Sequence, residues 1–317
     1  MSPMNFAPHP DPAYAAMQQW PQQWSDLETR LAALLLSPQG AAGFVDTLRD
    51  VHQQGRQLLE LDADSTLYWL FQLASSSTVS YSASHAMVCW ALCQLVADDF
   101  KLGPAERDSL ALAALTMNLS MTRLQDTLAE QTAPPTTEQR AQIDTHAPRS
   151  AQWLRELGVQ DPLWLETVEQ HHDASASLPL TTRLLQAMDR YAALISPRES
   201  RPGRCVTDSA RHMVVRAGQT LDDVGHALLR TVGICPPGTF VRLADERIAV
   251  VLRRSSRPGE PWVATVLDAH GTPVVEPELI DTGLDGLGIE AALVSRTVRV
   301  RLNHPRLLQL SRMALSH

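Results

Sequence analysis

The spacing of apolar residues changes once along the chain, near Gly233, and this change constrains the fold more than any other feature. Before Gly233, apolar residues lie mostly three or four positions apart, as Trp24, Leu27 and Leu31 do, which is the period of an amphipathic helix. After Gly233, short runs rich in Val and Ile alternate apolar and polar residues, a pattern typical of strands. These runs span residues 240–243, 248–252, 262–267 and 298–302. The sequence therefore predicts a mainly α protein with a small C-terminal β module.

Three segments follow from this pattern. Residues 1–78 are predicted to form a loose tail and an N-terminal helical layer, because the first twenty residues contain four prolines before the helical period is established. Residues 79–233 are predicted to be a helical domain, and residues 234–317 a β module that ends in a short helix beginning near His304. Within the first segment, Asp64 is predicted to cap the start of a helix.

Two further helix starts can be placed from capping residues. Thr136 and Gln139 have the spacing of a capping box, which puts His146 near the far end of the helix that begins there. Asp161 before a proline predicts the start of the next helix. We expect that helix to end at the histidine doublet 171–172.

Composition argues against several classes of function. A net charge of −8 and an isoelectric point near 5.7 disfavour a nucleic-acid polymer as partner, because such surfaces gather Lys and Arg. The longest apolar runs are far shorter than the roughly 18 residues needed to cross a bilayer, and the N-terminus lacks the layout of a secretory signal. Four cysteines without a CxxC pair favour reduced thiols and a cytoplasmic location. Two of them, Cys89 and Cys93, have apolar neighbours and are interpreted as core residues.

The doublet His171-His172 is the most informative motif in the chain. Successive helical residues point about 100° apart, so two adjacent rings at a helix end can reach one site and serve different coordination positions. His146 lies one helix upstream, Asp189 lies one helix downstream, and His85 begins an apolar helix. Each residue alone is an ordinary polar residue near a helix end. Taken together and in this order, they predict a metal site.

This ordered series resembles the HD-GYP family, bacterial metal-dependent phosphohydrolases of the HD superfamily that hydrolyse cyclic di-GMP. The resemblance runs from about Val79 to Leu302 and implies an HD-type helical bundle. Asp173 follows the doublet where the family usually has Glu. The matching segments are Ser84-His85, residues 113–115 and 135–138, His146, the doublet, residues 188–194 with Arg198 and Arg201, and residues 233–239.

The chain departs from the family at its defining His-Asp pair, because the expected positions hold Met117 and Asn118. A thioether is a poor ligand for iron or manganese, and an amide cannot provide the anionic bridge of a carboxylate. Two cations about 3.5–4 Å apart repel strongly without such a bridge, which argues against a two-metal centre. Met121 replaces a lysine that would balance phosphate charge. The family's glycine-tyrosine-proline loop is reduced to residues 175–179.

Further ligands of the family are also replaced. Ala192 stands where a second aspartate is expected after Asp189, and Tyr81 stands where members richer in metal have a glutamate, four residues before His85. These substitutions again indicate fewer metal ions than the family usually holds.

Two functions remain open at this point. One is a degenerate HD-GYP-like signalling protein without cyclic di-GMP hydrolysis, which acts as a regulatory or scaffold domain and binds a signalling protein as partner. The alternative is a phosphohydrolase that works through one divalent metal (Fe, Mn or Zn) held by His146, His171 and His172. In either case the resemblance implies a cyclic dinucleotide or another phosphoester as ligand. A site with no metal at all also remains open.

Overall fold

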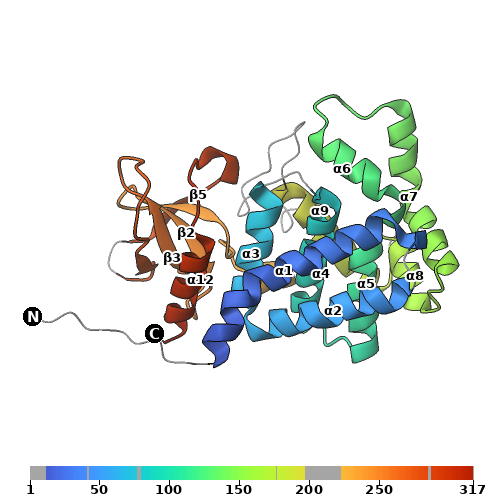
Figure 1. Ribbon diagram of the computed structural model, residues 1–317, viewed down its shortest axis with the longest axis horizontal. Coiled ribbons are helices and arrows are strands. Elements are labelled where there is room, and N and C mark those ends of the chain that lie inside the picture. Colours follow the sequence, from blue (N-terminus) through green and yellow to red (C-terminus); the bar gives the residue numbers. More distant parts are fainter. Residues whose placement is uncertain are drawn as a thin grey trace, which may run out of the picture.

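The computed structural model describes residues 12–40, 43–76, 80–175, 177–196, 223–284 and 287–316. These residues form a mainly helical body followed by a small antiparallel sheet, as predicted (Figure 1). The helices are α1 (Pro12–Leu36), α2 (Phe44–Leu61), α3 (Ala63–Ser76), α4 (Tyr81–Val96), α5 (Pro104–Thr116), α6 (Thr122–Glu130), α7 (Thr137–Glu156), α8 (Pro162–Glu169), α9 (Leu180–Ile195), α11 (Asp223–Val232) and α12 (His304–Met313). Short 3-10 turns are η1 (Pro38–Gly40), η2 (Leu119–Met121), η3 (Ser295–Thr297) and η4 (Ala314–Ser316).

The N-terminal layer consists of α1, α2 and α3. Helix α1 begins at Pro12, so the prediction of a loose tail through residue 20 was wrong for residues 12–20. The reason is packing: Trp20 is fully buried and its ring meets those of Trp24 and Trp69 edge-on, which extends the apolar face of the helix toward its start. Residues 1–11 lie outside the described part of the chain.

The cap of α3 is Asp62, and the prediction that Asp64 fills this position was wrong. The Asp62 carboxylate accepts hydrogen bonds from the backbone N–H and the hydroxyl of Ser65, three residues later, which is the geometry of an N-cap. Asp64 lies in the first turn of the helix and instead pairs with Arg254 from the sheet. A carboxylate near the start of a helix can either cap the helix or form an ion pair. Asp64 forms the ion pair, so the cap is left to Asp62.

Helix α4 is the centre of the helical body. Fifteen of its sixteen residues are buried, and it packs against α1, α3, α5, α6, α9 and α11. A helix that is apolar around its whole circumference must lie inside the core. His85 and Cys89, on successive turns of α4, are therefore placed in the interior of the molecule.

Helices α7 and α8 pack against each other and position the three histidines. Both predicted starts are confirmed: Thr136 forms a capping box with Gln139, and Asp161 caps α8. Helix α7 is twenty residues long, so His146 lies in its middle and not near its far end as predicted. Helix α8 ends at Glu169, so the prediction that it ends at the doublet was wrong: His171 and His172 lie in the turn that follows the helix.

The sheet contains β1 (Phe240–Leu243), β2 (Ile248–Arg253), β3 (Trp262–Leu267), β4 (Leu279–Asp281) and β5 (Ile289–Leu293) in the order β4-β3-β2-β1-β5, with all neighbours antiparallel. Three predicted strands are confirmed, but the strand predicted over residues 298–302 does not form. Strand β5 pairs with β1 in its place. Val298, Val300 and Leu302 pack their side chains on the core without joining the sheet, so their alternation reflects burial alone.

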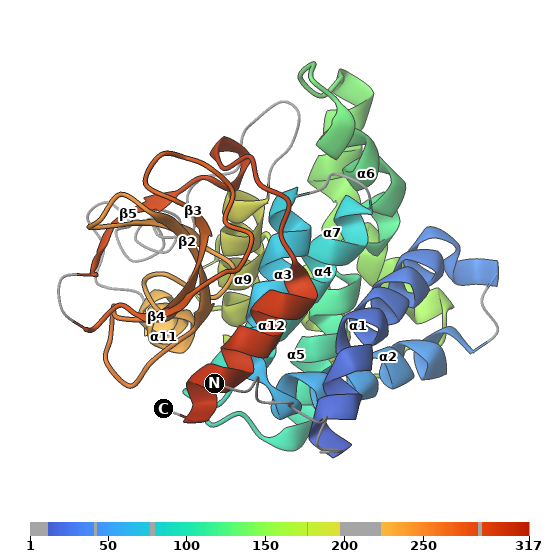
Figure 2. The same cartoon turned by 60° about the vertical axis from the view of Figure 1, so that its left-hand side comes forward.

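Helix α12 joins the sheet to the helical body (Figure 2). It contacts β2 and β3, while Ser311 and His304 reach Ser65 and Tyr68 on α3. Buried residues from both parts form one continuous hydrophobic core. Among the described helices, none has the length and apolarity needed to span a membrane.

Candidate metal centre

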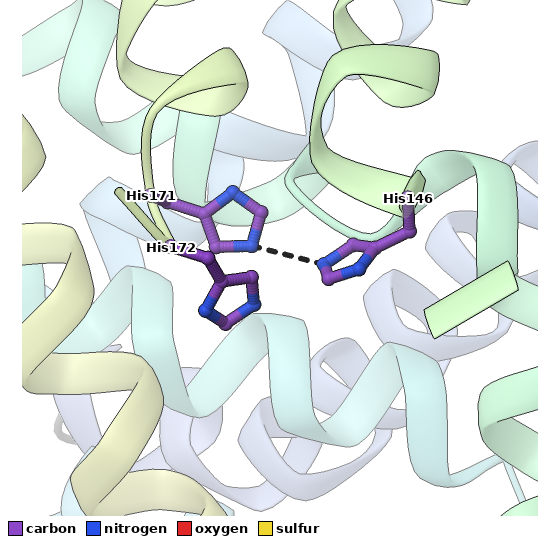
Figure 3. A group of neighbouring side chains, drawn as sticks. All are labelled: His146, His171 and His172. Atoms are coloured by element: carbon purple, nitrogen blue, oxygen red, sulfur yellow. Dashed lines mark hydrogen bonds between the residues drawn. The ribbon is translucent and has the colours of Figure 1, made fainter. Parts of the chain in front are cut away.

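Three histidines from two helical segments converge at one point (Figure 3). His146 comes from the middle of α7, and His171 and His172 come from the turn after α8. Their ring centroids lie 5.0, 4.9 and 4.1 Å apart, and each ring offers a nitrogen within 4.8 Å of the others. His146 and His171 are buried, whereas His172 is exposed and opens the cluster to solvent.

The backbone fixes which nitrogen of each buried ring bears the hydrogen. His146 Nδ1 lies 2.5 Å from the carbonyl oxygen of Ile143, and His171 Nδ1 lies 2.7 Å from that of Val168. A carbonyl oxygen can only accept, so Nδ1 donates in both rings. Each neutral ring therefore has a lone pair on Nε2, and this orientation by a backbone acceptor is typical of histidines that bind metals.

The two Nε2 atoms of His146 and His171 face each other at 3.1 Å. Two lone pairs at this distance repel unless a proton or a cation lies between them. Burial lowers the pKa of His171 to about 3, reinforced by the charge of His172, and burial also lowers the pKa of His146. A shared proton is therefore disfavoured at neutral pH, which leaves a cation as the species that fits.

The separation also suits an ion. Two nitrogens at 2.0–2.1 Å from one tetrahedral ion lie roughly 3.3 Å apart, close to the 3.1 Å between the two rings. Imidazole nitrogens suit zinc, iron and related transition metals. The three histidines thus fit a divalent metal in donor type, tautomer and spacing.

A second group lies on α4 and α9. His85 Nε2 is 2.8 Å from Asp189 Oδ1, and Cys89 Sγ is 3.6 Å from the same nitrogen. Burial opposes ionisation of Asp189, but the hydrogen bond from His85 and the electrostatic interactions with His85, His171 and His172 together outweigh it and hold the pKa of that carboxyl well below its usual range. Asp189 is therefore an anion within electrostatic range of the doublet, and the two groups adjoin each other.

Met117 and Asn118, where the family's pair was expected, follow the last turn of α5. The turn that begins after them is attached to α7: Ser120 Oγ donates to the carbonyl of His146 at 2.9 Å, and the Ser120 N–H donates to Ser150 at 3.0 Å. This segment is therefore attached to the helix that bears His146, but Met117 and Met121 are buried apolar side chains. The side chains at positions 117, 118 and 121 therefore offer neither an imidazole nor a carboxylate.

Several contacts around the site could not be read from the sequence. Gln186 on α9 donates to the carbonyl of Asp173 at 2.7 Å and ties the loop after the doublet to the helix that bears Asp189. Asp173 itself is exposed and accepts from the N–H of Ser175, so it shapes the loop. Arg198 and Arg201 lie outside the described residues.

Cys89 and Cys93 are fully buried in the hydrophobic core, as predicted, and Cys89 also lies in the same group as His85 and Asp189. Its position four residues after His85 on one helix was the available signal. That spacing is equally common among core residues, so the sequence alone could not assign it.

Comparisons with known proteins give one relative. The chain is 24% identical over 310 residues to cyclic di-GMP phosphodiesterase PA4108 of Pseudomonas aeruginosa. The aligned region covers 90% of this chain and 72% of the relative. No family model matches the chain. No solved structure matches it either. The similarity to this relative supports the HD-GYP type indicated by the order of the site residues.

Proposed function

We propose that this chain is a cyclic di-GMP signalling protein in which His146, His171 and His172 hold one divalent metal and bind a phosphate of the dinucleotide without hydrolysing it. The observation that supports this most strongly is the pair of Nε2 atoms facing each other at 3.1 Å with both Nδ1 atoms committed to backbone carbonyls. Such an arrangement is costly for two neutral rings and favourable around a cation.

The exposure of His172 gives a ligand access to the centre. Three protein ligands leave at least one coordination position open, which distinguishes such a centre from a closed structural site. A divalent ion held there would supply Lewis-acid attraction for a phosphate oxygen. Asp189 stays ionised beside the doublet, and its negative charge favours retention of the ion.

The dinucleotide is proposed as ligand because the relative with 24% identity is named a cyclic di-GMP phosphodiesterase. The absence of hydrolysis is proposed from Met117, Asn118 and Met121. The first two remove an imidazole and an anionic bridge, and the third removes a cation near the phosphate. A domain that binds the messenger and does not destroy it suits a regulatory or scaffold role, in which a signalling protein recognises the ligand-bound state.

The test is calorimetric titration of cyclic di-GMP into the full chain, loaded with zinc or manganese or stripped with a chelator, with chromatography of the mixture after incubation. We expect binding that chelation and His171→Asn abolish, and we expect the dinucleotide to be recovered intact. His270→Asn, in an exposed turn of the sheet, is the matched control and should bind normally. Equal binding with and without metal would contradict the proposal.

A second candidate is hydrolysis through the single metal. The observation that favours it is Asp189, an anion 2.8 Å from His85 and beside the doublet, where it can orient a nucleophile toward a phosphoester. Appearance of the linear dinucleotide in the same incubation, abolished by the chelator and reduced by Asp189→Asn, would replace the binding-only proposal with this one.

A further inference from the structure

Cys89 lies one turn after His85 on α4, so the two side chains share a face of that helix. Its Sγ is 3.6 Å from His85 Nε2, and Asp189 Oδ1 approaches the same nitrogen from α9 at 2.8 Å. One sulfur, one nitrogen and one oxygen thus lie within 4.8 Å of one another in the interior. Cys93, another turn along, is equally buried but belongs to no such group among the described residues.

The distance between Cys89 Sγ and His85 Nε2 fits a small transition-metal ion. Bonds of about 2.3 Å to sulfur and 2.0–2.1 Å to nitrogen place the two atoms roughly 3.6 Å apart around a tetrahedral ion, which is the separation of Cys89 Sγ and His85 Nε2. The 2.8 Å between His85 Nε2 and Asp189 Oδ1 is that of a hydrogen bond. An ion that binds both atoms replaces the shared proton and requires the two atoms to separate toward the roughly 3.3 Å of a tetrahedral pair.

The ring of His85 can carry that hydrogen on its other nitrogen. Its Nδ1 is buried and has no hydrogen-bond partner among the described residues, in contrast to the rings of His146 and His171, whose Nδ1 atoms donate to the backbone. The ring is held instead by stacking on Tyr81, with centroids 5.7 Å apart and planes within 12°. The hydrogen can therefore reside on Nδ1 while Nε2 serves as a ligand.

The charges of these three groups also favour binding of a divalent ion. A divalent ion with one thiolate, one carboxylate and one neutral imidazole forms a set with no net charge, which burial tolerates far better than a bare carboxylate or a bare ion. The thiolate also restores an anionic ligand to a site where Met117 and Asn118 supply none. A soft sulfur ligand favours zinc, whereas a set of oxygen and nitrogen ligands alone also accepts iron or manganese.

We propose that Cys89 is a metal ligand, and that His85, Cys89 and Asp189 bind a second divalent ion, zinc, next to the three-histidine ion. This inference rests on the proposed function and adds a second ion to the proposed centre. The two ions have different ligands, so one ion can be absent while the other is bound. Binding releases one proton, from the Cys89 thiol to solvent, as the sulfur–metal bond forms.

The experiment is the absorption spectrum of the full chain loaded with cobalt(II), together with metal analysis of the zinc form. We expect the near-ultraviolet band of a thiolate–cobalt bond in the unsubstituted chain, in Cys93→Ser and in His171→Asn, and its loss in Cys89→Ser. Zinc content is expected to fall from two ions per chain to one in Cys89→Ser and to stay at two in Cys93→Ser.

A missing band in the unsubstituted chain, or a band that persists in Cys89→Ser, would overturn the inference. A third outcome is that the unsubstituted chain holds one ion, shows no band, and loses that ion in His171→Asn. This outcome would leave the proposed function standing and remove only the second site. Should Cys89→Ser fail to fold, as judged by circular dichroism, X-ray absorption of the unsubstituted zinc form decides the question. A zinc–sulfur distance near 2.3 Å supports the inference, and a shell of nitrogen and oxygen alone contradicts it.

Discussion

His52 on α2 has a distinct role for each ring nitrogen. Nδ1 accepts a hydrogen bond from Trp90 Nε1 at 3.0 Å, so it is not protonated, and Nε2 donates to Asp108 at 3.2 Å. A second proton on the ring would place two donors face to face at Trp90. Burial, only partly offset by Asp108, accordingly lowers the pKa of His52 below its ordinary value of 6.5.

This histidine predicts a loss of stability in acid. Because the folded chain holds His52 neutral while the unfolded chain protonates it, its contribution to folding is complete above the ordinary pKa of 6.5 and is lost as the pH falls below that value. The slope is at most about 1.4 kcal/mol per pH unit for one proton. Urea titrations at pH 7 and pH 5 are expected to show a smaller pH effect in His52→Gln than in the unsubstituted chain, with His270→Gln as the unaffected control. An identical pH effect in both variants would refute this role.

The residues of the candidate centre differ in how far the sequence could predict them. The order of His85, His146, the doublet and Asp189 predicted that they belong together, and the structure brings them into two adjoining groups. Cys89 could not be assigned, because a cysteine one turn from a histidine looks the same whether it packs or ligates. The partners of the ring nitrogens depend on helix packing and leave no pattern in the sequence.

At the scale of elements, the start of α8 determines where the doublet lies. Asp161 accepts from the backbone N–H groups of Leu163 and Trp164 at 3.0 and 3.2 Å, and Ser109 on α5 donates to its other oxygen at 2.6 Å. Asp161→Ala removes the cap and a link to α5, and we expect it to lower the free energy of unfolding by about 1–2 kcal/mol. Glu166→Ala, on the exposed side of the same helix, should change it by less than about 0.5 kcal/mol. Equal effects in urea denaturation would show that the cap is not what holds α8.

Helices with capping signals were predicted well, and strands without local signals were not. Thr136 and Asp161 mark their helices in the sequence, because a cap depends on residues three or fewer positions away. Strand β5 depends on pairing with β1, about fifty residues earlier along the chain, and was missed. Residues 298–302 have the alternation of a strand, but β5 and not this segment pairs with β1.

At the scale of the whole molecule, a buried ionic cluster fastens the sheet to the helical body. Arg253 at the end of β2 pairs with Asp62 and Asp64 at the start of α3, and its Nε donates to the carbonyl of Ser311 on α12 at 3.0 Å. About a tenth or less of each of these charged side chains is exposed. Removing one partner therefore leaves buried charge without compensation.

Arg253→Met is expected to lower the free energy of unfolding by about 3–5 kcal/mol, because Asp62 stays buried without its cation. Arg247→Met is the matched control, since Arg247 directly precedes β2 and pairs with the more exposed Asp245 and Glu278. This substitution should cost at most about 1 kcal/mol. Chemical denaturation of the full chain measures both. A similar, small cost for the two variants would mean that hydrophobic packing alone joins sheet and helices.

The mainly helical architecture with a C-terminal sheet was predictable because the change from helical to alternating spacing at Gly233 is a property of the sequence itself. The division at residues 78 and 233 stays a prediction. The continuous core and the Arg253 cluster, by contrast, depend on contacts between residues nearly two hundred positions apart. Such contacts are invisible to any local pattern.

The central claim is that His146, His171 and His172 hold a metal ion, and metal analysis of the purified full chain tests it most directly. After equilibration with zinc or manganese and removal of excess ion, the account predicts stoichiometric metal in the unsubstituted chain. It predicts one ion fewer per chain in His171→Asn and no change in His270→Asn. An unsubstituted chain that retains no ion, or a His171→Asn variant that retains as much as the unsubstituted chain, would contradict it.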